Sequence, residues 1–157
     1  GRIGMEPGWT HVPSLLRALW HTSGPVLEFG AGNYSTPVLH EMCQAMNREL
    51  VTVEQDPTWG QFAAGYSTPQ HIVLVGSYEV IRQDLLQSNV HWGLVFLDQA
   101  PDEDRTMTQQ VFRDRADVLL RHDSGEQDGF QYRVVDTRFN PTTVFLSQTD
   151  PLDWAKS

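Results

Sequence analysis

The sequence of 157 residues contains very little cysteine and lysine. Cys43 is the only cysteine, so an intrachain disulfide and a cysteine-based zinc site are both excluded. Lys156 is the only lysine, and the formal net charge is −9. A surface of this charge repels phosphate backbones, and no cluster of basic residues interrupts it. We therefore expect no nucleic-acid partner.

Long hydrophobic runs are also absent. No apolar stretch has the length that a bilayer span requires, and no charged-then-apolar segment has the form of a secretion signal. We therefore expect a cytoplasmic protein with no membrane partner. Apolar residues make up 39% of the sequence and charged residues 20%, which is typical of a globular domain. The length predicts a single domain over residues 1–157.

Short apolar runs alternate with amphipathic segments along most of the chain. The predicted helices cover residues 9–23, 35–46, 57–64, 77–88 and 102–116, and the predicted strands cover residues 25–29, 49–54, 71–75, 92–98 and 117–121. Strands that alternate with helices indicate right-handed βαβ units and a parallel sheet that is covered on both faces. The predicted fold class is therefore a doubly wound α/β domain.

The pattern changes after residue 124. Residues 131–139 and 142–148 are predicted to be two strands with no helix between them, which indicates an antiparallel hairpin at the sheet edge. Only residues 125–131 separate this hairpin from the preceding strand, and so short a segment cannot form a helix that crosses the sheet. We therefore expect a late helix to be missing. The sheet face left open in this way favours a homo-oligomer.

Polar residues follow the carboxyl end of every predicted parallel strand. In open α/β sheets, ligands bind beyond these ends, near the point where the strand order reverses. Five such ends on one rim predict a binding site. The five stretches are Glu28–Ser35 (EFGAGNYS), Glu54–Asp56, Gly76–Tyr78, Asp98–Gln99 and His122–Ser124.

The first of these stretches holds two glycines and an acid. Gly30 and Gly32 would let the backbone turn sharply, either to approach a ligand or only to reverse the chain. Glu28 would repel a pyrophosphate and attract an ammonium group. Ser35 is the predicted N-cap of the next helix and stands where a dinucleotide fingerprint has its third glycine. The turn therefore favours an ammonium-bearing ligand over a diphosphate.

Two further strand ends suit a nucleoside. Glu54 follows the second strand, where an acid can accept both hydroxyls of a ribose, although it is also compatible with a solvated loop acid. Ser77 and Tyr78 follow the third strand, where an adenine could stack on the tyrosine ring or bond to the serine. Tyr78 is equally compatible with a packing role at the start of the next helix.

Four motifs in this order resemble the successive motifs of class I S-adenosylmethionine-dependent methyltransferases: VLEFGAGNYS, LVTVEQDP, VLVGSYEVI and WGLVFLDQAP. The resemblance implies a Rossmann-like fold and S-adenosylmethionine as cofactor, with the glycines near its methionine part and Glu28 near its amino group. It also implies that Glu54 holds the ribose and that Ser77 and Tyr78 flank the adenine. The cofactor-binding residues expected on this basis are Glu28, Gly30, Gly32, Asn33, Ser35, Glu54, Gln55, Gly76, Ser77, Tyr78 and Asp98.

Within that superfamily, WGLVFLDQ followed by ADVLLRHDS most resembles the small-molecule O-methyltransferases of the catechol type. There a fourth-strand Asp and a fifth-strand Asp–Asn pair bind a divalent ion. Asp98 and Asp123 match the two acids, whereas Ser124 stands in place of the asparagine. Two alternatives stay open: the two acids and water hold Mg2+, or His122 or Asp123 acts as a general base on a hydroxyl. The expected catalytic residues are Asp98, His122 and Asp123.

Three functions compete on this reading. The leading one is methyl transfer from S-adenosylmethionine to a hydroxyl of a small molecule or sugar. The second is an accessory protein that binds S-adenosylmethionine without catalysis, which the missing helix motivates. The third is an NAD-dependent oxidoreductase, which Glu28 and Ser35 disfavour.

Overall fold

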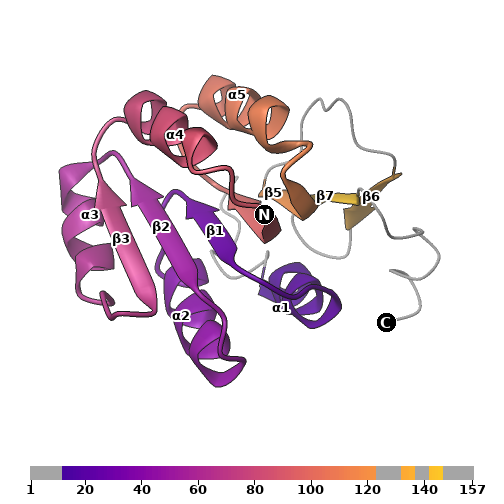
Figure 1. Cartoon of the computed structure of the whole chain (residues 1–157), viewed down its shortest axis with the longest axis horizontal. Helices are drawn as coiled ribbons and strands as arrows, with labels where there is room; N and C mark the ends of the chain where they lie inside the picture. The colour runs from indigo at the N-terminus through magenta and orange to yellow at the C-terminus, as the bar shows by residue number, and fades with distance from the viewer. Residues whose placement is uncertain (1–11, 123–131, 137–141, 147–157) are drawn as a thin grey trace, which may run out of the picture.

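Helices and strands alternate through residues 12–122, as the sequence predicts (Figure 1). The computed structural model describes residues 12–122, 132–136 and 142–146. The helices are α1 (Val12–His21), α2 (Ser35–Ala45), α3 (Pro57–Ala64), α4 (Tyr78–Gln87) and α5 (Asp102–Phe112). The strands are β1 (Val26–Phe29), β2 (Leu50–Glu54), β3 (His71–Val75), β4 (Trp92–Leu97), β5 (Ala116–His122), β6 (Tyr132–Asp136) and β7 (Thr142–Leu146).

The seven strands form one sheet in the order β3-β2-β1-β4-β5-β7-β6. The first five are parallel to one another, and β7 is antiparallel to both β5 and β6. This confirms the doubly wound α/β fold and the antiparallel hairpin at its C-terminal edge. The chain order reverses between β1 and β4, which places the expected binding site outside the carboxyl ends of these two strands.

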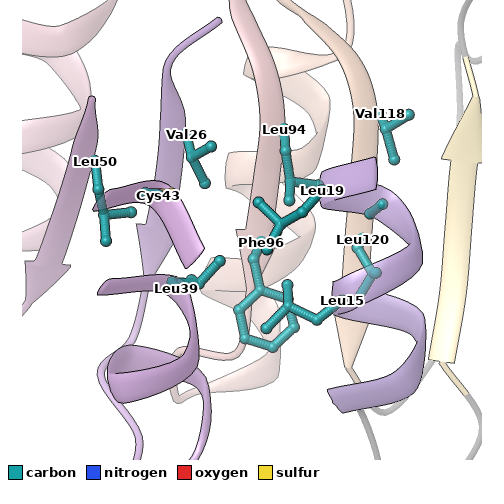
Figure 2. Close-up of a cluster of buried hydrophobic side chains, with 11 residues drawn as sticks. Leu15, Leu19, Val26, Leu39, Cys43, Leu50, Leu94, Phe96, Val118 and Leu120 are labelled. Atoms are coloured by element: carbon teal, nitrogen blue, oxygen red, sulfur yellow. The ribbon is translucent and has the colours of Figure 1, made fainter. Parts of the chain in front are cut away.

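The sheet is covered on both faces. α1 and α2 pack on one face over a core of buried apolar side chains that includes Leu15, Leu39 and Phe96 (Figure 2). α4 and α5 pack on the other face, where Phe112 lies against Phe29 with 5.9 Å between ring centroids. Every residue of β4 is buried, which explains why its sequence is a continuous apolar run and not an alternating one.

The element boundaries differ from the sequence prediction mainly near the C-terminal end of α5. The predicted helix over residues 102–116 ends at Phe112, and Ala116 already belongs to β5. The expected absence of a late helix concerns residues 125–131, which lie outside the described residues. Within the described residues, no helix has the length and hydropathy that a membrane crossing needs.

Candidate cofactor-binding cleft

A cleft of about 440 Å³ opens at the carboxyl ends of the parallel strands, where the strand order reverses. Its size is in the range of small-molecule sites. The lining residues are Gly30, Ala31, Glu54, Gln55, Asp56, Pro57, Trp59, Tyr78, Asp98, Gln99 and Ala100. The structure therefore brings together five of the expected cofactor-binding residues, namely Gly30, Glu54, Gln55, Tyr78 and Asp98.

Gly30 is required because the glycine turn lies against the end of β4. Its φ is +91°, and a Cβ built on it would lie 2.7 Å from the backbone nitrogen of Gln99. The same junction is joined by a hydrogen bond of 2.9 Å from the Asp98 N–H to the Phe29 carbonyl. The glycine thus permits a close approach between β1 and β4, which forms the floor of the cleft.

The backbone N–H groups of the turn are already paired within the protein. The N–H of Gly30 donates to a carbonyl of β2 at 2.8 Å, and the N–H of Ala31 donates to the Glu54 carboxylate at 2.8 Å. The N–H of Gly32 donates to the Thr36 hydroxyl at 3.0 Å. An anion would find no unpaired donor among these three groups, so the turn is unsuited to cradle a diphosphate.

Glu28 is fully buried beneath the turn and does not line the cleft. Its carboxylate accepts hydrogen bonds from the hydroxyls of Ser35 at 2.6 Å, Thr36 at 3.0 Å and Thr52 at 2.9 Å. The expected N-cap role of Ser35 is wrong, since Tyr34 occupies the cap position and the Ser35 hydroxyl is directed to Glu28. In this arrangement Glu28 holds the start of α2 and the middle of β2 to β1.

The burial of Glu28 changes its acidity. Loss of contact with water raises the pKa of Glu28 to about 7, because desolvation disfavours the charged form. The three hydroxyl donors oppose this shift, whereas the charge of Asp98 adds to it. The Glu28 carboxyl therefore gains or loses its proton as the pH passes through neutrality.

Glu54 reaches the cleft and is oriented by several donors. One carboxylate oxygen accepts the Ala31 N–H, and the other accepts the Asp56 N–H at 2.8 Å and the Tyr78 hydroxyl at 3.0 Å. Burial raises the pKa of Tyr78 well above its ordinary value, and the Glu54 charge adds to this effect, so the phenol stays protonated and donates. Glu54 is therefore held as a hydrogen-bond acceptor at the end of β2.

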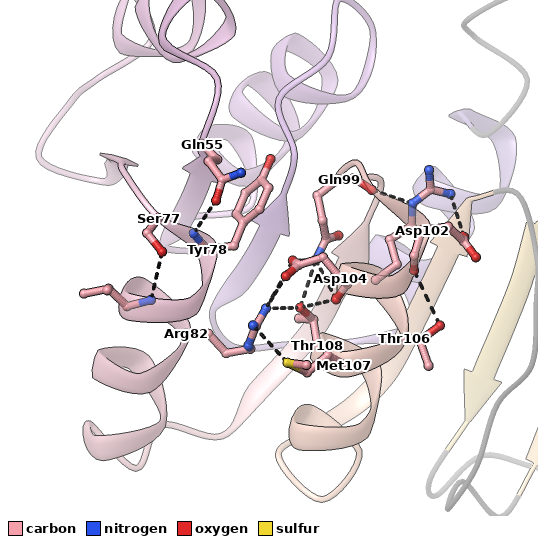
Figure 3. Close-up of polar contacts among 12 residues, drawn as sticks. Gln55, Ser77, Tyr78, Arg82, Gln99, Asp102, Asp104, Thr106, Met107 and Thr108 are labelled. Atoms are coloured by element: carbon pink, nitrogen blue, oxygen red, sulfur yellow. Dashed lines mark hydrogen bonds and ion pairs between the residues drawn. The ribbon is translucent and has the colours of Figure 1, made fainter.

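The other expected cofactor-binding residues lie outside the cleft lining. Ser77 caps α4 by accepting the Val80 N–H at 3.4 Å, so its hydroxyl has a structural role (Figure 3). Beside it, the Tyr78 N–H donates to the Gln55 side chain at 3.1 Å. The full set of expected residues that do not line the cleft is Glu28, Gly32, Asn33, Ser35, Gly76 and Ser77.

Asp98 and His122 meet at the ends of the neighbouring strands β4 and β5. The Asp98 Oδ1 and His122 Nδ1 atoms are 3.0 Å apart, and the two side chains are 26% and 12% exposed, respectively. Arg105 joins the same two strand ends, because it donates to the carbonyl of Gln99 at 2.6 Å and to that of His122 at 2.9 Å. The guanidinium of Arg105 thus fixes the spacing at which Asp98 and His122 face each other.

The metal alternative involves residues that lie outside the described ones. Asp123 and Ser124 are not described. Among residues 12–122 and the strands β6 and β7, no group of three or more His, Cys, Asp or Glu side chains is arranged to hold a metal ion. The Mg2+ site and the catalytic role of Asp123 therefore stay predictions.

Trp59 and Gln99 line the cleft but are not among the expected cofactor-binding residues. Trp59 projects from the first turn of α3 and is 38% exposed, and its ring packs edge-on against Phe62 with 5.5 Å between centroids. Gln99 is 1% exposed, and its Nε2 donates to the Asp104 carboxylate at 3.1 Å and to Thr108 at 2.9 Å (Figure 3). Since a carboxylate only accepts, these bonds fix the amide with Nε2 toward α5. Its Oε1 has no hydrogen-bond partner in the described part of the chain.

Comparison with known proteins identifies the fold. No protein-family model and no curated sequence matches the chain. Among solved structures, the chain is similar to a protein from Staphylococcus aureus provisionally named a caffeoyl-CoA O-methyltransferase, with a TM-score of 0.65 and 11% identity over 91% of this chain and 84% of the other. It is also similar to a point mutant of the nicotianamine synthase MtNAS, with a TM-score of 0.56 and 12% identity over 89% of this chain. The chain spans 60% of the length of MtNAS.

These likenesses confirm the Rossmann-like fold of class I S-adenosylmethionine-dependent methyltransferases. At 11% and 12% identity they show the fold, and the chemistry must be argued from the residues of the cleft.

Replacing Gly30 by alanine is expected to destabilise the protein strongly. The positive φ costs about 1–2 kcal/mol in an L-residue, and the clash with the end of β4 adds about 1–3 kcal/mol. Gly24 is a matched control, because its φ is +86° and a Cβ there would meet nothing within 4 Å. Urea unfolding should show a larger loss for Gly30→Ala than for Gly24→Ala. Equal losses would contradict the close approach.

Replacing Glu28 by glutamine is expected to change the pH dependence of stability. Because the folded-state pKa of Glu28, about 7, is above its ordinary value of 4.5, the stability it contributes is complete below pH 4.5 and is lost as pH rises through 7. The loss amounts to about 3 kcal/mol. Glu28→Gln should therefore gain stability relative to the wild type between pH 5 and pH 8, as measured by urea unfolding.

The exposed Glu41 on α2 supplies the control for this comparison. Glu41→Gln should leave the pH profile unchanged. The pKa of His71 is lowered by burial to about 4, so its own contribution is present above pH 6.5 and is lost as pH falls through 4. That contribution is common to wild type and variant, and the difference isolates Glu28. A wild-type profile in Glu28→Gln would show that Glu28 is already ionised at pH 5.

Proposed function

We propose that the chain is an S-adenosylmethionine-dependent methyltransferase that acts on a hydroxyl of a small molecule or sugar. The observation that carries the proposal is the charge of the cleft. Glu54, Asp56 and Asp98 contribute three carboxylates, and none of the described lining residues is Lys, Arg or His. Such a lining attracts a cationic ligand with hydrogen-bond donors and repels a dinucleotide diphosphate.

The residues of the cleft fit the parts of S-adenosylmethionine. Glu54 would accept the ribose hydroxyls, since its carboxylate is held at the strand end by the Ala31 N–H and the Tyr78 hydroxyl. The rings of Trp59 and Tyr78 would bound the adenine.

The bound cofactor supplies a methyl group on a sulfonium that carries its own leaving group. The protein must then orient the acceptor and remove its proton. Asp98 accepts the Nδ1–H of His122, which fixes the ring orientation and makes Nε2 the basic nitrogen. We assign His122 as the general base that takes the proton of the acceptor hydroxyl, and Asp98 as the group that orients it.

Ligand binding tests the cofactor assignment. S-adenosylmethionine and S-adenosylhomocysteine should bind in isothermal titration calorimetry, whereas NAD should not, because its diphosphate meets the acidic lining. Binding of NAD alone would contradict the proposal and favour an oxidoreductase.

Replacing His122 by glutamine tests the catalytic assignment. Loss of a general base should lower kcat by about 10²–10⁴-fold. The dissociation constant for S-adenosylmethionine should not change, because His122 does not line the cleft. Turnover is measured as release of S-adenosylhomocysteine with a panel of catechols and sugars as acceptors.

His91 provides a matched control, because its Nε2 lies 2.8 Å from Asp117 Oδ1 in a pair that is exposed and remote from the cleft. His91→Gln should turn over at the wild-type rate. Equal rates for His122→Gln and wild type would remove His122 from the mechanism. Tight binding of the cofactor without turnover on any acceptor would instead support the accessory protein.

A further inference from the structure

A continuous chain of hydrogen bonds crosses the sheet from α2 to β1. His40 Nδ1 on α2 lies 2.9 Å from His71 Nδ1 on β3. His71 Nε2 lies 2.8 Å from the Thr52 hydroxyl on β2, and that hydroxyl lies 2.9 Å from Glu28 Oε1 on β1. The three strands are neighbours in the sheet (Figure 1). The side chains of Glu28, Thr52 and His71 are almost completely buried, whereas His40 is half-buried.

The ionised state of Glu28 fixes the direction of every bond in this chain. A carboxylate only accepts, so the Thr52 hydroxyl donates to Glu28 and accepts from the Nε2–H of His71. His71 Nδ1 then carries a lone pair and accepts from the Nδ1–H of His40. Each atom in the chain therefore has one assigned role.

A proton on Glu28 reverses all of these bonds. The Glu28 O–H then donates to Thr52, the Thr52 O–H donates to His71 Nε2, and the His71 Nδ1–H donates to His40 Nδ1. One proton added at His40 Nε2 converts the first state into the second. At His40, His71 and Thr52 one N–H or O–H bond breaks and one forms, and at Glu28 one O–H bond forms, so the added proton neutralises the Glu28 carboxylate.

The buried groups have the protonation properties that such a transfer needs. Burial, together with the charge of His40, lowers the pKa of His71 to about 4, so His71 is neutral near pH 7 and can both donate and accept. Burial raises the pKa of Glu28 to about 7, the hydroxyls of Ser35, Thr52 and Thr36 oppose this shift, and Asp98 on β4 adds to it. Both states of Glu28 are therefore populated near neutral pH.

A further titratable group close to Glu28 is the Cys43 thiol on α2. Burial raises the pKa of Cys43 to about 11, so the thiol is neutral in this pH range. Cys43 also lines a small cavity beside His40 and His71, with a volume of about 10 Å³, which is at the lower limit for one water molecule.

We propose that Glu28 exchanges its proton with solvent through this hydrogen-bonded relay, in which His40 is the residue that takes up and releases the proton at the protein surface. Glu28 and the glycine turn share Thr36, whose hydroxyl bonds both the carboxylate and the Gly32 N–H. The charge of Asp98, which lines the cleft, also raises the pKa of Glu28. A cation bound in the cleft favours ionised Glu28, so binding of S-adenosylmethionine releases a proton through the relay. This coupling rests on the proposed function, whereas the relay itself does not.

The relay is tested without any ligand by infrared spectroscopy after a pH jump across pH 7. The C=O band of the protonated carboxyl, assigned by its loss in Glu28→Gln, should appear at a rate at least about tenfold slower in His40→Phe than in wild type. The midpoint of the titration should stay the same in His40→Phe, because this ring does not contact Glu28. An unchanged rate in His40→Phe, or no carboxyl band at pH 6, would overturn the relay.

Substitutions of Thr52 interrupt the proposed relay at a second position and include a matched control. Thr52→Val removes the hydroxyl and should slow the band in the same way, whereas Thr52→Ser keeps the hydroxyl and should relax at the wild-type rate. Equal rates for these two variants would overturn the path through β2.

The coupling is tested by calorimetry of S-adenosylmethionine binding at pH 7 in two buffers of different ionisation enthalpy. Wild type should release a fraction of a proton, and Glu28→Gln should release none. Binding with no proton release in wild type would overturn the coupling and leave the proposed function standing. Absence of binding would overturn the proposed function and the coupling together, while the infrared result still decides the relay.

Discussion

A single carboxylate that water cannot reach holds together the elements around the glycine turn. Glu28 bonds hydroxyls from the start of α2 and from β2, and the same Thr36 hydroxyl that it engages also receives the Gly32 N–H. The glycine turn lies against the end of β4 and forms the floor of the cleft. The cleft therefore depends on a polar group that does not line it, and three hydroxyl donors offset only part of the cost of burying that group.

The fold follows from the sequence because local and tertiary signals agree. The buried apolar run of β4 and the helix- and strand-breaking residues around each strand predict nearly every element boundary. The alternation of strands and helices then indicates a parallel α/β sheet. The end of α5 is the exception. Residues 113–115 continue the helical polar pattern of DEDRTMTQQVF but connect it to β5, and no breaker residue marks the change.

The sequence predicts only those residues of the candidate site that directly follow the ends of parallel strands. Glu54, Tyr78 and Asp98 reach the cleft because the carboxyl ends of parallel strands meet on one rim. Glu28 does not, since sequence position gives its place on β1 but not the hydroxyls that enclose it. Trp59 is missed because the rotation of α3 over the sheet is a tertiary property, which the spacing of apolar residues in a short helix does not fix.

The acidic lining also bears on how a reaction in this cleft would end. Transfer of a methyl group from a sulfonium leaves a neutral thioether, so the product carries one positive charge less than the donor it replaces. The carboxylates that attract the donor would consequently hold the spent cofactor less firmly. Exchange of product for fresh donor would then be favoured by the loss of positive charge in the reaction, and this preference would weaken as added salt screens the field.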